Sequence, residues 1–202
     1  MGLFDKKNCS ICEAKTNMLT NRKLADGNLC VNCAKQLSPF TEGRKNQTVA
    51  DIQDHLAYRE ANKAEVASFN PTREFGVDMS LFGFGDAARV FFDDNKGAFI
   101  LTRSAKKWRE QNPDVIKFSQ VKGCSYGMDQ RSVVTQGASN SISEREYDTI
   151  LNVKVDSPYF ESAKLQLNNQ PTSSAIDKDQ VEYTRLAQDI KDALLAEAKL
   201  DA

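Results

Sequence analysis

Two Cys-x-x-Cys pairs dominate the N-terminal part of the sequence. Cys9 and Cys12 form the first pair, and Cys30 and Cys33 form the second. Each pair predicts a tight turn that directs two sulfur atoms to one point, and four such sulfurs make the closed tetrahedral shell of a structural Zn²⁺ site. A segment this short buries too little apolar surface to fold alone, so we expect one zinc ion to act as its core. A closed shell has no open position for a substrate, which argues against zinc catalysis.

Two disulfides or two redox Cys-x-x-Cys motifs are the alternatives to a zinc site. The first seven residues contain no apolar run of the signal-peptide type, and the pairs lack a βαβ context, so both alternatives are disfavoured. No window approaches 18 consecutive apolar residues, so we expect no transmembrane helix. Cys124 is left over as a lone thiol, which fits a reducing compartment. The sequence therefore predicts a cytoplasmic protein.

The chain between and after the two pairs has the signals of a small metal-bound module. Asp26-Gly27 predicts a hairpin turn, because glycine tolerates the positive φ of tight turns. Residues 33–37 are good helix formers, and Ser38-Pro39 ends the short helix that they predict. Knuckle, hairpin, second knuckle and short helix together describe a zinc ribbon or a treble-clef-like unit.

These residues carry a family resemblance. Residues 1–7, the Cys-x-Ile-Cys pair and the run from Asn21 to Lys35 resemble a small N-terminal zinc-ribbon family of unknown function. That family occurs mainly in uncharacterised bacterial proteins of the Gram-positive type and in their mobile elements. The resemblance covers about the first 40 residues and all four cysteines, with Glu13 at a position where the family often has glycine. It implies a zinc-binding module and brings no established activity.

The pattern after the ribbon predicts an α+β chain with three parts: a zinc ribbon at 1–47, a linking helix at 48–70 and a second domain at 71–202. Thr48 and Asp51 resemble a capping box that opens the helix, which we expect to run to about residue 67. The apolar stripe of this helix is thin, so it should lie on a neighbour or bridge two modules. His55, the one histidine of the chain, stands among polar residues and is predicted to be exposed to solvent.

Residues 71–202 change to a period of two and then return to a helical period. Strands are expected at 77–81, 89–93, 98–101, 115–118, 121–126, 147–155 and 159–167, and residues 127–145 form a long hairpin tip or a mobile loop. An amphipathic helix then runs from Asp177 or Asp179 to about residue 199. This order resembles a pleckstrin-homology-like fold, an antiparallel β-barrel or bent sheet capped by a C-terminal helix. Another small barrel or sandwich with a helix at one end is the alternative.

One exposed cluster in the second domain is a candidate site for anions or partners: Lys106, Lys107, Trp108 and Arg109. A basic run beside an aromatic ring can bind phosphates, acidic lipid heads or RNA. The favoured interpretation is a solvated loop with Trp108 docked on the core.

Other chemical motifs are weaker. Gly83-Phe84-Gly85 lacks the third glycine and the following helix of a phosphate-binding loop, and Cys124 has no assigned base, so we expect an inert thiol. The strand phenylalanines are predicted to be core residues: Phe82, Phe84, Phe91, Phe92, Phe99 and Phe118.

These observations favour a non-enzymatic binding or adaptor protein. Its partner would be another protein, bound at the sheet edges or in a groove beside the last helix. The alternative is nucleic-acid binding by the ribbon, because residues 1–47 have eight Lys/Arg and four Asp/Glu. Its basic residues are Lys6, Lys7, Lys15, Arg22 and Lys23. Membrane binding through the 106–109 cluster is disfavoured, since residues 48–202 carry 19 Lys/Arg and 24 Asp/Glu.

Overall fold

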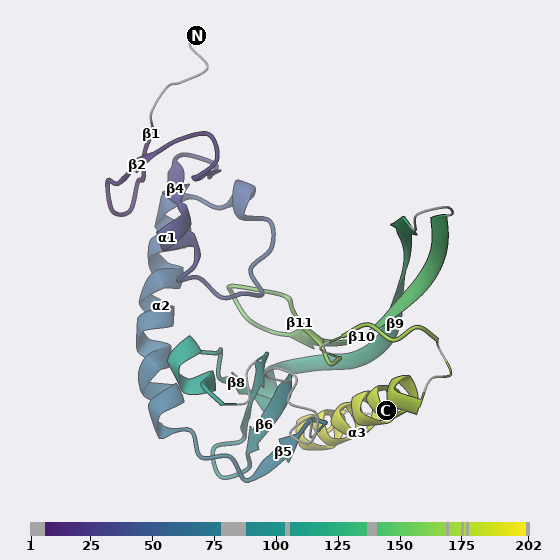
Figure 1. Cartoon of the computed structure of the whole chain (residues 1–202). Helices are drawn as coiled ribbons and strands as arrows, with labels where there is room; N and C mark the ends of the chain where they lie inside the picture. The colour runs from purple at the N-terminus through teal and green to yellow at the C-terminus, as the bar shows by residue number, and fades with distance from the viewer. Residues whose placement is uncertain are drawn as a thin grey trace. The chain divides into compact units, whose positions relative to one another are not determined.

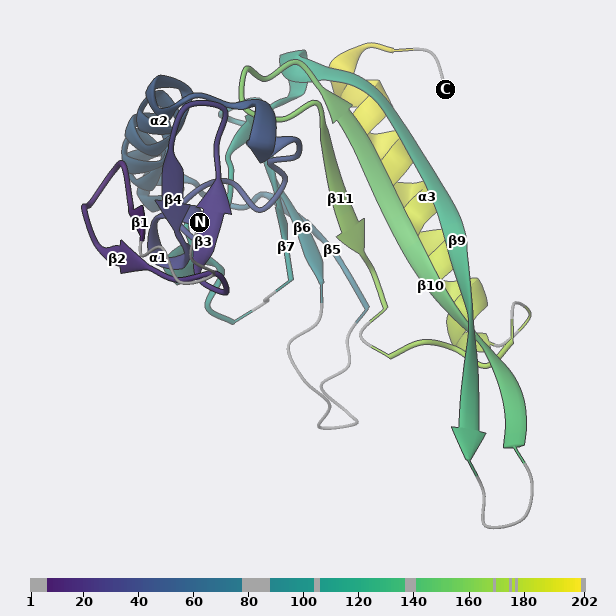
Figure 2. The ribbon, with the colours of Figure 1, turned by 90° about the horizontal axis from the view of Figure 1, so that it is seen from above.

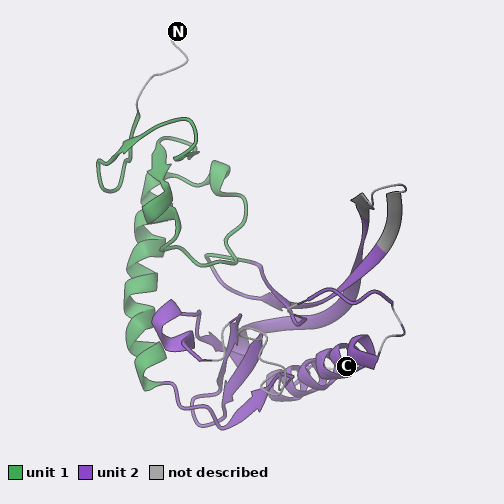
Figure 3. Ribbon diagram, viewed as in Figure 1, with its two compact units in different colours: residues 1–68, 158–160 green, residues 69–157, 161–202 purple. Residues whose placement is uncertain are grey.

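The structure is a computed structural model, and the chain in it forms two compact units. It describes residues 7–77, 88–103, 106–136, 141–168, 170–174, 176 and 178–200, with the backbone alone at 134–136 and 141–144. Unit 1 comprises Met1–Ser68 and Pro158–Phe160, and unit 2 comprises Phe69–Ser157 and Glu161–Ala202 (Figure 3).

Unit 1 contains two short hairpins, a short helix and a long helix (Figure 1). Strand β1 (Lys7–Asn8) pairs with β2 (Lys15–Thr16), and β3 (Asn21–Lys23) pairs with β4 (Asn28–Cys30), both antiparallel. Helix α1 (Val31–Ala34), the 3-10 turn η1 (Arg44–Asn46) and helix α2 (Val49–Ser68) follow. The hairpin predicted around Asp26-Gly27 is confirmed. A short helix is also present, but it spans Val31–Ala34, so it begins and ends earlier than the predicted helix at 33–37, and Ser38-Pro39 does not end it.

The predicted capping box opens helix α2. The backbone N–H of Thr48 donates to Asp51 Oδ2 at 2.7 Å, and the N–H of Asp51 donates to Thr48 Oγ1 at 3.2 Å. The N–H of Val49 donates to Asp26 Oδ1 at 2.8 Å, so the hairpin turn also caps the helix. A carboxylate at a helix start is favourable because it satisfies free amides and complements the helix dipole.

The core of unit 1 joins the ribbon to the first half of α2. Leu24, Leu29 and Ile52 are each at most 1% exposed and lie in one cluster with Leu37 and three of the four cysteines. Each such aliphatic side chain contributes about 1.5–3 kcal/mol on burial. This is a small core, and a metal ion held by the cysteines would add to the stability of this segment.

His55 is buried, so its predicted exposure was wrong. Its side chain is 1% exposed, and Nε2 accepts a hydrogen bond from the backbone N–H of Ser38 at 3.2 Å. The ring stacks on Tyr159 at a centroid distance of 4.5 Å, and Tyr159 also stacks on Tyr58 at 4.5 Å. Burial, assisted by the positive charge of nearby arginines, lowers the pKa of His55 to about 4. The polar residues next to His55 in the sequence did not indicate that the Tyr159 side chain would cover its ring.

Unit 2 has two antiparallel sheets and a long helix (Figures 1 and 2). The first sheet has the order β5 (Arg73–Phe75), β6 (Arg89–Asp93), β7 (Ala98–Thr102) and β8 (Ile116–Lys117). The second has the order β11 (Ser162–Gln166), β10 (Ser141–Val155) and β9 (Val121–Gln136), and helix α3 (Lys178–Ala198) ends the unit. The 3-10 turns η3 (Trp108–Gln111) and η4 (Phe118–Gln120) lie between strands. The described residues form no closed barrel.

Strands β9 and β10 extend much further than the sequence predicted. Residues 127–136 and 141–145, expected in a hairpin tip or a mobile loop, continue the ladder as far as Ser141 opposite Gln136. Polar cross-strand partners stabilise this part, and Arg131 Nε donates to Glu146 Oε2 at 2.6 Å. Alternation of apolar and polar residues is absent there, which is why the pattern indicated a loop. In contrast, Tyr159 and Phe160 lie outside strand β11, where the sequence had placed them in a strand.

The core of unit 2 is aromatic on the first sheet and aliphatic under α3. The described phenylalanines of the predicted core are buried, and the rings of Phe99 and Phe118 stack at 5.8 Å. Helix α3 lies along strands β9 and β10 (Figure 2) and buries Ala187, Ile190 and Leu194. Most of the strand predicted at 77–81, together with Phe82, Gly83-Phe84-Gly85 and their surroundings, lies outside the described residues. No helix in the described part of the chain is both long enough and apolar enough to cross a lipid bilayer.

Candidate metal centre

Four short elements position the four cysteines. Cys9 and Cys12 lie in the turn between β1 and β2, Cys30 ends β4, and Cys33 lies in α1. Cys30 is the N-cap residue of α1, and its Sγ accepts from the backbone N–H of Cys33 at 3.4 Å. The backbone N–H of Cys30 in turn donates to Cys9 Sγ at 3.3 Å. Sulfur atoms held by backbone amides in this way are oriented before any metal binds.

The sulfur positions match a tetrahedral metal site. All four Sγ atoms lie within 4.8 Å of one another, with Cys9 and Cys33 at 3.9 Å and Cys12 and Cys30 at 3.6 Å. A Zn–S bond of about 2.3 Å in a tetrahedron requires S–S separations of about 3.8 Å. A disulfide requires about 2 Å, and the structure has all four as free thiols. The cluster can therefore hold one metal ion as it stands.

The protonation of the cluster is uneven. Burial opposes ionisation of Cys9, but hydrogen bonds from backbone N–H groups, among them those of Cys12 and Cys30, outweigh it and lower the pKa of Cys9 to about 6. Burial, together with hydrogen bonds to the neighbouring thiols, raises the pKa of Cys33. In the absence of a metal, Cys9 therefore loses its proton more readily than Cys33. A bound cation would displace those protons, so metal affinity should fall at low pH.

Exposure and packing indicate a structural role for the cluster. Cys9, Cys30 and Cys33 are buried within the core of unit 1, whereas Cys12 is exposed at its edge. Four cysteines complete the tetrahedron, and no further position is left for water or substrate. A metal here would stabilise the ribbon and would not carry a reaction.

Glu13 holds an unusual backbone conformation beside the site. Its φ is +60°, in the left-handed region, and its N–H donates to the carbonyl oxygen of Cys9 at 2.9 Å. The N–H of Cys9 donates to the carbonyl oxygen of Ala14 at 2.9 Å, which closes the knuckle. This is the position at which the resembling family often has glycine, and glycine adopts this φ without steric cost.

The second predicted site does not form one exposed surface. Lys106 and Lys107 are exposed, but Trp108 is 6% exposed and packs against Phe91 at a centroid distance of 5.3 Å. The guanidinium of Arg109 lies 4.1 Å from the Trp108 ring centroid, and its Nη2 donates to the carbonyl oxygen of Phe69 at 3.0 Å. The expected docking of Trp108 on the core is confirmed. Trp108 and Arg109 therefore have structural contacts of their own.

The remaining sequence candidates are placed as follows. Lys7, Lys15, Arg22 and Lys23 are exposed in β1, β2 and β3, whereas Lys6 lies outside the described residues. Cys124 is half-buried in β9, and burial raises its pKa to about 11, which fits the inert thiol that was expected. The sequence analysis missed Arg44 and Lys45, which η1 brings close to Arg22 and Lys23 in unit 1.

Comparison with protein families places the cysteine cluster within a domain of unknown function. A family described as Domain of unknown function (DUF4428) matches residues 7–55, a span that contains all four cysteines and the start of α2. The match and the cysteine cluster together fit an N-terminal zinc-binding domain of unknown function. Comparisons with curated proteins and with solved structures found no match.

Proposed function

We propose that this chain is a non-enzymatic adaptor protein that binds another protein and is stabilised by one structural Zn²⁺. The four cysteines would hold the ion, because their number, spacing and sulfur geometry suit zinc. The role of the ion is to fold the ribbon and to hold its loops in place. An exposed apolar turn of that ribbon is the observation that carries the proposal.

Met18 and Leu19 are adjacent large apolar residues that unit 1 leaves exposed. Their side chains are 79% and 80% exposed, in the turn between β2 and β3. The turn is fixed by Asn17, whose Oδ1 accepts from the N–H groups of Leu19 at 2.9 Å and Thr20 at 3.0 Å. The hydroxyl of Thr20 accepts from the N–H of Asn17 at 3.0 Å. A rigid turn that presents two apolar side chains is suited to insert into a partner, because little entropy is lost on binding.

The second unit supports an interaction role by analogy. Four antiparallel strands, then three, then a C-terminal helix are the elements of a pleckstrin-homology-like domain, and we propose this fold for unit 2. Strand β9 is an edge of its sheet, and edges of this kind can accept a further strand from a partner. This argument rests on the fold alone. Five free cysteines suit a reducing compartment, so the proposed location is a bacterial cytoplasm.

Metal analysis and partner capture test the proposal. Mass spectrometry of protein purified without added zinc should find about one zinc per chain, as expected for a closed four-cysteine site. Cross-linked capture from native cells should then be compared for the wild type, for the double variant Met18→Ser/Leu19→Ser, and for Val181→Ser. Val181 is a matched control because it is an apolar residue 56% exposed on α3 of unit 2. A partner lost with the first variant and kept with the second supports the proposal, and equal capture by all three proteins contradicts it.

Nucleic-acid binding is the second candidate function. The observation that favours it is the exposure of Lys7, Lys15, Arg22 and Lys23 on the ribbon strands. Contacts to phosphates release counterions, so binding of this type weakens steeply as salt rises. A gel-shift series with DNA and RNA at low salt tests it, and no shift at low salt would remove this candidate.

A further inference from the structure

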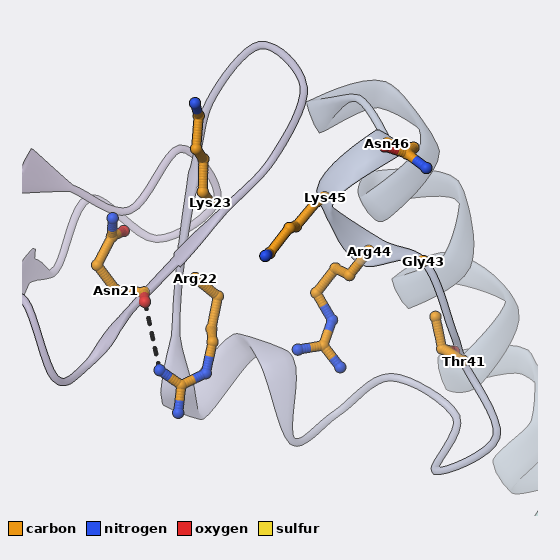
Figure 4. A pocket seen from close by; sticks show the side chains of 8 residues that line it. All are labelled: Asn21, Arg22, Lys23, Thr41, Gly43, Arg44, Lys45 and Asn46. Carbon is orange, nitrogen blue, oxygen red and sulfur yellow. Dashed lines mark hydrogen bonds between the residues drawn. The ribbon is translucent and has the colours of Figure 1, made fainter.

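Unit 1 has a basic pocket that is separate from the cysteine cluster. Its volume is about 660 Å³, and it lies between β3 and the segment around η1 (Figure 4). Four cationic residues line it: Arg22 and Lys23 from β3, and Arg44 and Lys45 from η1. No carboxylate is among the described lining residues. Like charges around one hollow repel one another, and a bound anion would relieve that repulsion.

The two walls of the pocket are fixed relative to each other by main-chain contacts. The N–H of Ala25, just after β3, donates to the carbonyl oxygen of Gln47, just after η1, at 2.8 Å. Gly43 begins η1 with a φ of +65°, a conformation that glycine adopts without strain. The pocket is therefore preformed, and a ligand would not have to order it.

Three cationic side chains are directed toward the same space. In Figure 4 the guanidinium groups of Arg22 and Arg44 and the ammonium group of Lys45 converge, while Lys23 points away. Arg22 Nη1 donates to the carbonyl oxygens of Leu19 at 2.9 Å and Asn21 at 3.3 Å. The other N–H groups of the Arg22 guanidinium remain available to a ligand. Within the described part of the chain, none of the three forms an ion pair with a carboxylate.

Three buried polar atoms of the pocket-lining residues form no hydrogen bond within the described part of the chain: Arg44 Nε, Thr41 Oγ1 and Asn21 Oδ1. Arg44 Nε and Thr41 Oγ1 can donate, whereas Asn21 Oδ1 can only accept. Buried donors are nearly always satisfied in native proteins, so the two unsatisfied donors suit a ligand that accepts hydrogen bonds. A guanidinium N–H and a hydroxyl both donate well to an oxyanion.

The geometry points to a binding site for a phosphate monoester, formed by Arg22, Thr41, Arg44 and Lys45. Arginine forks match the oxygens of phosphate, and the ammonium group adds a point charge. The pocket is larger than one phosphate group, so it also has room for part of the molecule that carries it. No aromatic side chain is among its described lining residues, which disfavours single-stranded nucleic acid, because that class of ligand stacks its bases on aromatic rings. This inference goes beyond the proposed function, since neither Met18 nor Leu19 lines the pocket.

The phosphate monoester can be a phosphorylated side chain of a partner protein or a small free molecule, and calorimetry distinguishes the two. The probes are a phosphoserine peptide, the same peptide without phosphate, glycerol 3-phosphate, and an oligonucleotide with no terminal phosphate, all in low-salt buffer free of phosphate and sulfate. The phosphoserine peptide and glycerol 3-phosphate should each bind at one site per chain, and the unphosphorylated peptide should not bind. Tighter binding of the peptide would indicate a phosphorylated partner protein, and tighter binding of glycerol 3-phosphate would indicate a small free molecule. Backbone amide NMR signals of Thr41 and Gly43 should shift on addition of either monoester.

Two charge-matched double variants localise the binding. Arg44→Gln/Lys45→Gln should weaken monoester binding about tenfold or more, because charged hydrogen bonds are lost. Lys7→Gln/Lys15→Gln removes the same charge from exposed positions of β1 and β2 and should change it by less than about twofold. Zinc content checks that both variants fold. If Arg44→Gln/Lys45→Gln does not fold, the NMR shifts of the wild type decide whether the monoester binds at this pocket. The proposal is overturned by no monoester binding, by equal weakening in both variants, or by tighter binding of the oligonucleotide to the same residues.

Discussion

Replacing Glu13 by glycine should stabilise the metal-binding ribbon. Glu13 has a φ of +60°, and its side chain makes no hydrogen bond or ion pair within the described residues. A left-handed conformation costs an L-residue about 1–2 kcal/mol, whereas glycine loses about 0.5–1 kcal/mol more in chain entropy on folding. The difference predicts a net gain of about 0.5–1 kcal/mol for Glu13→Gly.

Zinc affinity is the sensitive assay for this gain, because metal binding and folding of such a ribbon are coupled. A gain of about 1 kcal/mol corresponds to about fivefold tighter apparent zinc binding. Competition with a chromophoric chelator measures it directly. Glu13→Gln is the matched control, because it removes the negative charge beside the thiolates but keeps the Cβ that causes the strain.

The comparison of the two Glu13 variants decides the argument. Tighter binding by Glu13→Gly than by Glu13→Gln attributes the gain to the backbone. Equal binding by the two variants would mean that charge alone acts there. In that case the reasoning from the left-handed φ is refuted.

Three further predictions concern metal removal, acid stability and a buried polar network. Treatment with a strong chelator should remove amide-exchange protection from the ribbon, and so should the substitution Cys30→Ser in the absence of a chelator. Unit 2 has its own core and should keep its protection. Loss of protection in both units would contradict this prediction. Since His55 has a pKa of about 4 when folded and about 6.5 when unfolded, its contribution to stability is complete above pH 6.5 and is lost as the pH falls toward 4. Denaturant unfolding at pH 7 and pH 5 should therefore show a smaller acid loss for His55→Gln than for the wild type, and equal losses would show that His55 is not buried neutral. Gln180 is fully buried, donates to Thr149 Oγ1 at 2.6 Å and accepts from Thr172 Oγ1 at 2.7 Å. Thermal unfolding of Gln180→Leu should therefore show a free energy of unfolding lower by about 1–3 kcal/mol. An unchanged melting temperature would argue against this network.

Several features of unit 1 were predictable because they depend on neighbours in the sequence. The spacing of Cys9, Cys12, Cys30 and Cys33 was enough to predict one site, since each pair forms a local turn and the hairpin between them brings the pairs together. The hairpin at residues 26–27 and the capping of α2 also depend on contacts between residues close along the chain.

The full length of the β9–β10 hairpin was beyond local reasoning because residues 127–136 and 141–146 are mostly polar, with only scattered apolar positions. Pairing there depends on cross-strand partners such as Arg131 and Glu146, which are 15 positions apart in the sequence. The outer parts of the two strands, residues 127–136 and 141–146, do not carry the alternation that marks one buried face. The length of the hairpin is therefore set by cross-strand pairing and not by the apolar–polar pattern of the sequence.

Tertiary contacts decided which polar and aromatic residues are buried and which come together. His55 is buried because Tyr159, more than a hundred positions away, stacks on its ring, and Trp108 is buried because the first sheet supplies Phe91. The amino-acid sequence by itself determined the four cysteines of the candidate metal site, because residue type and short-range spacing are local. The basic pocket was decided by the tertiary structure alone, because Arg22 and Arg44 belong to different elements that meet through a main-chain hydrogen bond between Ala25 and Gln47.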